Sequence, residues 1–107
     1  HHILMEARMT EQLDPAAIEA AVAQLDGWQY DLQRKALVRH FVFADFSEAF
    51  GFMARVAHAA EKAGHHPEWS NVYKDVEIVL STHSAGGISA LDVDLATAID
   101  KLHRLAV

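Results

Sequence analysis

The sequence of 107 residues contains no cysteine. This absence excludes disulfide bonds, catalytic thiols and zinc sites built on thiolates, and because it fits a reducing compartment we expect a cytoplasmic protein. Basic residues are few: 9 Lys and Arg stand against 15 Asp and Glu, for a formal net charge of −6. Direct nucleic-acid binding is not expected, since it needs clustered Lys and Arg. No apolar run approaches the roughly 18 residues of a membrane span, so no membrane partner is expected.

The composition predicts one globular domain. The length falls in the range of roughly 100–200 residues that one domain occupies. Hydrophobic residues make up 51% and charged residues 22%, which is typical of a globular chain rather than a disordered one. Residues 1–8, beginning with His1 and His2, are interpreted as the remnant of a purification tag and linker, and they are excluded from fold reasoning. We therefore predict a single domain over residues 9–107.

The first half of the chain predicts a helix, two strands and a second helix. Asp14-Pro15 is typical of a helix start, and Gly27 is expected to end that helix. Alternating apolar residues over 28–32 and β-forming residues over 36–43 predict a strand pair. A D-x-x-E capping box at Asp45 opens the next helix, which Gly64 is expected to end. Its apolar stripe comprises Phe46, Ala49, Phe50, Met53, Val56, Ala57 and Ala60.

The second half predicts two strands and a final helix. A short segment around residues 71–73 is expected to pair, and the longer strand that follows places Val76, Ile78, Leu80 and Thr82 on one face. Ser89 and Asp92 have capping-box spacing before an apolar stripe that runs to Ala106. The order is α-β-β-α-β-β-α. It indicates an α+β fold, a four-stranded antiparallel sheet with three helices on one face.

The unusual feature of the sequence is the segment that begins at Glu61 and contains His65, His66, Pro67 and Trp69. It is followed by His83 at a strand end. Three interpretations stand. In the first, the histidines are surface-loop residues without a task. His40, His58 and His103 belong there and are assigned no role.

The second interpretation is a metal site. His65, His66, His83 and Glu61 would supply enough ligands for zinc. Adjacent histidines rarely direct both rings at one ion, however, and no H-x-x-x-H spacing is present. We therefore expect no bound metal.

The third interpretation is acid–base catalysis, because histidine can both donate and accept protons near neutral pH. Pro67 restrains His66 towards extended backbone, and the helix end near Gly64 favours a protonated imidazole. Trp69 either offers a flat surface for a planar heterocycle or is an anchor in the core or at its rim. Asp92 either contributes to the site or only completes the Ser89 cap.

A family resemblance extends this interpretation. The pattern E-x-x-x-H-H-P-x-W, then T-H-x-x-x-G and D, from Glu61 through His83 to Asp92, resembles the pterin-4a-carbinolamine dehydratase family. The helix containing Ala49-Phe50-Gly51-Phe52-Met53 is also similar, and the likeness extends over residues 28–102. The predicted element order agrees with the fold of that family.

The resemblance implies a hydro-lyase that removes water from a 4a-hydroxytetrahydropterin and so recycles the cofactor of aromatic amino-acid hydroxylases. It implies that His65, His66 and His83 are catalytic, with His66 and His83 as the acid–base pair and His65 orienting the pterin edge. Glu61, Pro67, Trp69 and Asp92 would support the site or bind substrate. No metal or organic cofactor is implied, since the pterin is the substrate.

The resemblance further implies a homodimer or homotetramer, through edge strands joined into one sheet and, in tetramers, packed helices. A monomer with a twisted or charged edge strand is the alternative. Two other functions stay open: a protein-binding dimerisation cofactor, or transcriptional coactivator, of the same fold, and a pterin-binding role without turnover.

Overall fold

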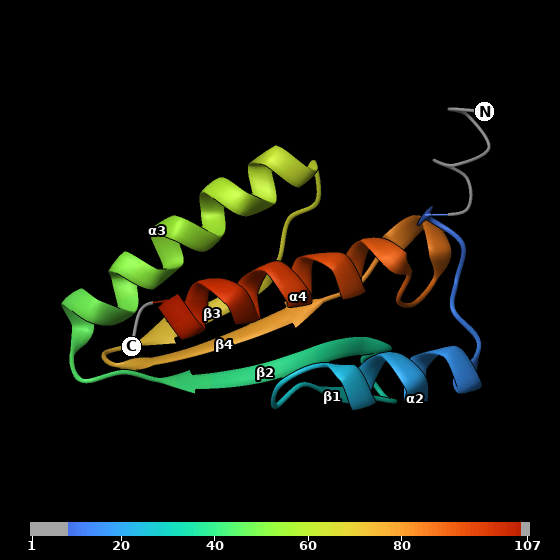
Figure 1. The fold of residues 1–107 in the computed structure, drawn as a ribbon, viewed down its shortest axis with the longest axis horizontal. Coiled ribbons are helices and arrows are strands. Elements are labelled where there is room, and N and C mark those ends of the chain that lie inside the picture. Colours follow the sequence, from blue (N-terminus) through green and yellow to red (C-terminus); the bar gives the residue numbers. More distant parts are fainter. Residues whose placement is uncertain (1–8, 106–107) are drawn as a thin grey trace.

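The structure is a computed structural model that describes residues 9–105. Helices α2 (Pro15–Gln24), α3 (Phe46–Ala63) and α4 (Ala90–Leu105) accompany a four-stranded antiparallel sheet (Figure 1). Its strands β1 (Gln29–Asp31), β2 (Ala36–Val42), β3 (Glu68–Val72) and β4 (Asp75–Leu80) lie in the order β1-β2-β4-β3. The predicted fold class is confirmed. The tag interpretation of residues 1–8 and the predicted helical position of Ala106 lie outside the described residues.

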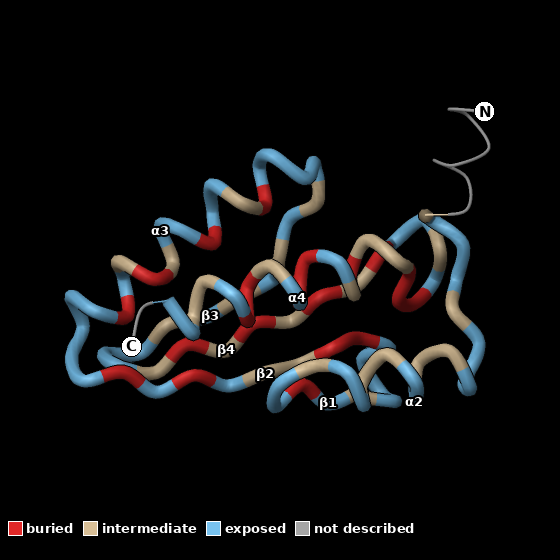
Figure 2. Tube along the Cα trace, viewed as in Figure 1, coloured by how far each residue is buried: buried red, intermediate tan, exposed pale blue. Residues whose placement is uncertain are grey.

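The hydrophobic core lies between one face of the sheet and the helices. In the register of β2 and β4, Leu37 faces Leu80 and Phe41 faces Val76, and all four side chains are buried. Helices α3 and α4 add Phe52, Val56 and Ile99 to the same cluster, and side chains of α2 pack against it. Figure 2 shows buried segments recurring along β2, β4, α3 and α4. The strand alternation predicted for residues 76–82 is confirmed, because the alternate side chains are buried on that inner face: Val76, Ile78, Leu80 and Thr82.

Helix α3 begins and ends as predicted. The side chain of Asp45 accepts a hydrogen bond from the Glu48 N–H at 2.8 Å, and Gly64 adopts the left-handed conformation with φ of 66°. Its apolar stripe is only partly buried. Phe52, which the predicted stripe omitted, lies in the core, whereas Phe46 and Phe50 are 49% and 57% exposed.

Three predicted boundaries differ from the structure. Helix α2 ends before Gly27 because the next segment is tied to α4, where Asp100 accepts the Asp26 N–H at 3.0 Å. Strand β3 begins at Glu68, earlier than the pairing predicted around residues 71–73, and Tyr73 lies in the turn with φ of 53°. Strand β4 stops at Leu80, since Thr82 forms an isolated bridge with Gly87.

A buried carboxylate joins α4 to the sheet. Asp100 accepts hydrogen bonds from Trp28 Nε1 at 2.7 Å and from Arg39 Nη1 at 2.5 Å. The ring of His103, one turn further along α4, packs edge-on against Phe41, 4.9 Å between ring centroids. Burial lowers the pKa of His103, and the positive charge of Arg39 lowers it further. At this end of α4, burial and the neighbouring guanidinium therefore both favour the neutral form of the His103 imidazole.

Among the described helices, none has both the length and the apolar character needed to cross a membrane.

Candidate active site

The candidate residues gather at one end of the sheet because of the pairing of β3 and β4. These strands are antiparallel, and Glu68 at the start of β3 lies opposite Val79 near the end of β4. The residues just before β3 therefore lie at the same sheet end as those just after β4. His65 and His66 belong to the first segment, and His83 belongs to the second.

His65 is held at the end of α3 by a buried carboxylate. Its backbone N–H donates to the Ala60 carbonyl at 3.1 Å, which continues the bonding of the helix end into the loop. Its side chain is 12% exposed, and its Nε2 lies 2.5 Å from Oδ1 of Asp92, which has no exposed surface. The imidazole of His65 is therefore the most firmly held of the three candidates.

Asp92 caps α4 and also contacts a candidate histidine. Its Oδ2 accepts the Ser89 N–H at 2.9 Å, and the Ser89 Oγ accepts the Leu91 N–H at 3.3 Å, so the cap of α4 is present. The same carboxylate contacts His65 through Oδ1 and accepts the Thr82 hydroxyl at 2.7 Å. The cap and the site therefore share one side chain.

His66 lies in a recess at the end of α3. Its Nε2 is 2.8 Å from Glu61 Oε1, and both side chains are exposed. Pro67 and Trp69 line the same recess of about 420 Å³, a volume within the range of about 300–1,000 Å³ found for small-molecule sites. Trp69 also packs against the core, so it is both a recess wall and a partly buried anchor.

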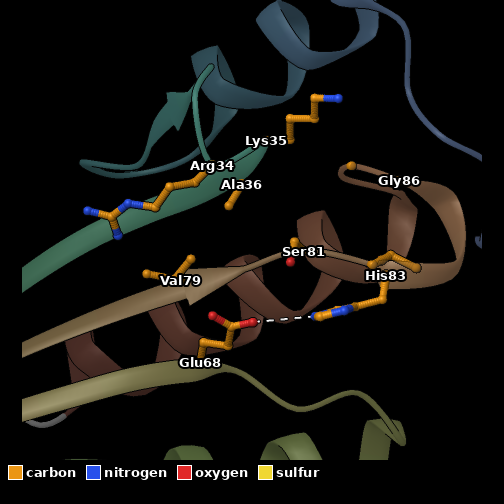
Figure 3. A pocket seen from close by; sticks show the side chains of 10 residues that line it. Arg34, Lys35, Ala36, Glu68, Val79, Ser81, His83 and Gly86 are labelled. Atoms are coloured by element: carbon orange, nitrogen blue, oxygen red, sulfur yellow. Dashed lines mark hydrogen bonds and ion pairs between the residues drawn. The ribbon is translucent and has the colours of Figure 1, made fainter.

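His83 lies in a second recess, of about 340 Å³. It is the first residue of the short 3-10 helix η1 (His83–Ala85), and its Nε2 is 3.4 Å from Glu68 Oε1 (Figure 3). Arg34 and Lys35, from the turn between β1 and β2, line the same recess. The structure thus gathers Glu61, His66, Pro67 and Trp69 in one recess and places His83 in the other.

All three candidate imidazoles share one arrangement. The Nε2 atoms of His65, His66 and His83 each face a carboxylate oxygen. Their Nδ1 atoms have no hydrogen-bond partner among the described residues. A ring held this way presents Nδ1 to solvent or to a bound molecule. Within residues 9–105, no three His, Asp or Glu side chains are grouped closely enough to hold a metal ion.

Sequence reasoning gave no role to two residues that contact the candidate set. Thr82 donates to Asp92 from a buried position, and Glu68 pairs with His83. The available signal was adjacency, because Thr82 precedes His83 and Glu68 follows Pro67 directly. Of the histidines assigned no role, His58 lines the recess of His66, and His40 lies 3.3 Å from Asp75.

Known proteins resemble this chain over most of its length. The sequence profile of the family described as pterin 4 alpha carbinolamine dehydratase matches residues 11–102. A protein of Rhodopseudomonas palustris (strain BisB18) is 55% identical over 94 residues, which are 88% of this chain and 93% of that protein. One of Nitrobacter hamburgensis is 55% identical over 96 residues, 90% of this chain and 95% of that protein. Both bear the name "Putative pterin-4-alpha-carbinolamine dehydratase".

Solved structures share the fold. A crystal structure from Brucella melitensis, described as a transcriptional coactivator/pterin dehydratase, is 44% identical with a TM-score of 0.83, over 86% of this chain and 98% of that chain. A pterin dehydratase-like protein described as a RuBisCO assembly factor in the alpha-carboxysome is 20% identical with a TM-score of 0.62, over 72% of this chain and 89% of that chain. At that identity the likeness concerns the fold alone. The profile match over most of the chain, together with the relatives at 55% identity, confirms the resemblance found in the sequence: this chain belongs to the pterin 4 alpha carbinolamine dehydratase family.

Proposed function

We propose that the protein is a hydro-lyase that converts a 4a-hydroxytetrahydropterin into a quinonoid dihydropterin and water. The observation that supports the proposal most strongly is the shared arrangement of His65, His66 and His83. Each has Nε2 beside a carboxylate oxygen and Nδ1 without a hydrogen-bond partner among residues 9–105. Family membership and the names of the relatives support the same reaction.

The reaction needs only proton transfers. The bond between the 4a-carbon and its hydroxyl breaks, and the oxygen leaves as water after it takes a proton from an acid. A ring N–H of the pterin gives its proton to a base, and its electron pair forms the new double bond. Each such transfer by a positioned side chain typically contributes ~10²–10⁴-fold to the rate. Histidine suits both steps because it changes charge near neutral pH.

The roles of the residues follow their exposure. His66 and His83 are 64% and 84% exposed in their side chains, so they exchange protons readily with water and are proposed as the acid–base pair. His65 is largely buried and held by Asp92, which suits an imidazole that binds and orients the pterin edge. Glu61 orients His66, while Pro67 and Trp69 shape the recess.

The structure describes one chain with two edge strands, β1 and β3. A homodimer or homotetramer is part of the proposal, because exposed edges invite pairing and Phe46 and Phe50 form an exposed aromatic pair on α3. The cytoplasmic location and the absence of any cofactor stay predictions. The description of the Brucella protein keeps the coactivator role as the alternative.

The experiment is a dehydration assay on a 4a-hydroxytetrahydropterin with purified protein. We expect the protein to accelerate water loss well above the uncatalysed rate, and we expect treatment with a metal chelator to leave that rate unchanged. Residues 1–8, which include His1 and His2 and are interpreted as a tag remnant, are removed first, because histidine is a common metal ligand. An uncatalysed rate in the presence of folded protein would favour the alternative roles, and loss of activity on removal of a stoichiometric metal would contradict the cofactor-free mechanism.

A further inference from the structure

Thr82 has no part in the mechanism above, yet it lies in the same buried network as His65. The residue is 5% exposed and lies two positions after the end of β4. Its Oγ1 lies 2.7 Å from Asp92 Oδ2 and 2.7 Å from Ser89 Oγ. Within residues 9–105, no buried polar side-chain atom lacks a hydrogen-bond partner, so each hydroxyl here has a defined use.

The direction of these hydrogen bonds follows from counting protons. A hydroxyl carries one proton, and the Thr82 hydroxyl donates that proton to the Asp92 carboxylate. The Ser89 hydroxyl is therefore the donor in its contact with Thr82 Oγ1. Ser89 Oγ accepts in turn from the Leu91 N–H. The donors form a one-way series that ends on Asp92, and such series strengthen their members cooperatively.

The two oxygens of Asp92 have separate partners. Oδ2 receives the Thr82 hydroxyl and the Ser89 N–H, whereas Oδ1 receives Nε2 of His65. Because a carboxylate only accepts, Nε2 must carry the imidazole proton. The other ring nitrogen, Nδ1, is then an acceptor in the neutral ring.

We propose that Thr82 is a positioning residue for the dehydration reaction. Its hydroxyl holds Oδ2 of Asp92, and this fixes the orientation in which Oδ1 keeps His65 as the Nε2–H tautomer. Nδ1 is thereby presented as an acceptor to an N–H or O–H group of the pterin. The assignment of the ligand rests on the proposed function, whereas the tautomer of His65 does not depend on it.

The competing explanation is that the hydroxyl only stabilises the start of α4. Two substitutions separate the explanations. Thr82→Val keeps the shape of the side chain and removes the hydroxyl, and Thr82→Ser keeps the hydroxyl. Thr97→Val is the matched control. The Thr97 hydroxyl donates to the Val93 carbonyl within α4, from an exposed position away from Asp92.

The first measurement is the pair of ¹⁵N chemical shifts of the His65 ring in the ligand-free protein, which distinguish the two tautomers. We expect one tautomer, protonated at Nε2, in the parent, in Thr82→Ser and in Thr97→Val, and a mixture in Thr82→Val. Parent-like shifts in folded Thr82→Val would overturn the proposal. If Thr82→Val does not fold, Thr82→Ala takes its place. It also removes the hydroxyl that donates to Asp92, without placing a methyl group against the buried carboxylate, and parent-like shifts in that variant would likewise overturn the proposal.

The second measurement is steady-state kinetics with a 4a-hydroxytetrahydropterin. Weakening a hydrogen bond to a charged group changes an equilibrium by about tenfold or more. We expect the KM of Thr82→Val to rise by about that factor, with kcat changed much less and both constants restored in Thr82→Ser. A fall in kcat by that same factor, with KM unchanged, would contradict a role in substrate positioning. Absence of turnover in the parent would refute the proposed function, and the ring shifts would still decide the tautomer.

Discussion

Nε2 of His65 lies 2.5 Å from Oδ1 of Asp92, a carboxylate with no exposed surface at the start of α4. His65 follows α3 in the chain, so this contact joins the ends of two helices that are separated by strands β3 and β4. The Glu61–His66 pair, by contrast, is open to water. Adjacent histidines therefore differ in how firmly they are held, which is the physical basis for giving them different tasks.

The first prediction concerns the free energy of unfolding and the buried carboxylate of Asp100. Replacing Asp100 by Asn leaves the Arg39 guanidinium, 15% exposed, without its ionic partner. Breaking a buried pair in this way typically costs about 3–5 kcal/mol. Urea unfolding measures this loss of stability. Asp94→Asn is the control, because Asp94 is exposed on the same helix, and its substitution should change the free energy of unfolding by no more than about 0.5 kcal/mol. A loss below about 1 kcal/mol in Asp100→Asn would show that the pair is not stabilising.

The second prediction concerns His103 and the pH dependence of the free energy of unfolding. The pKa of its imidazole in the folded protein lies below the ordinary value of 6.5, first because of burial and then because of Arg39. The unfolded chain therefore binds more protons below that value, and the contribution of His103 to the free energy of unfolding falls as the pH falls. We expect His103→Gln to lose less stability than the parent between about pH 7.5 and about pH 5.5.

Urea unfolding at the two pH values checks the expectation. His58→Gln is the control, because His58 is exposed on α3, and it should keep the pH dependence of the parent. Equal losses in the parent and in His103→Gln would contradict the assignment of the pH dependence to His103.

The assembly of the chain is the third prediction. Helices α2, α3 and α4 pack against the core on one side of the sheet, strand β3 forms one sheet edge, and Phe50 on α3 is 57% exposed. A self-complementary two-fold contact would cover such surfaces. We expect light scattering at micromolar concentration to give at least twice the single-chain mass. A mass near 11.8 kDa would refute the prediction.

Local signals predicted the element order and much of α3. Asp45 and Gly64 bound this helix because their side-chain chemistry acts on the adjacent turn. The end of α2 was predicted less well, since it depends on Asp100, 74 residues from its partner Asp26. Phe50 belongs to the predicted apolar stripe of α3 and is nevertheless exposed, because that stripe is wider than the surface that the sheet and α4 cover.

At the candidate site, too, local patterns predicted some features, whereas contacts between distant residues determined the others. The sequence pattern singled out His65, His66 and His83, because histidines beside Pro67 and after a strand are unusual. It left Thr82 without a role, since a hydroxyl gains one only when the fold brings Asp92 to it. The separation of His66 and His83 into two recesses depends on side-chain directions, which residue spacing does not specify.

The central claim is that histidines carry the proton transfers of dehydration, and the most direct measurement is the dehydration rate of His66→Ala and His83→Ala. We predict that each substitution lowers the rate by at least about tenfold, because each removes one acid or base. Both variants should keep the circular dichroism of the parent, and His40→Ala, altered at an exposed residue of β2, should keep its rate. Rates within about twofold of the parent for both His66→Ala and His83→Ala would contradict the claim.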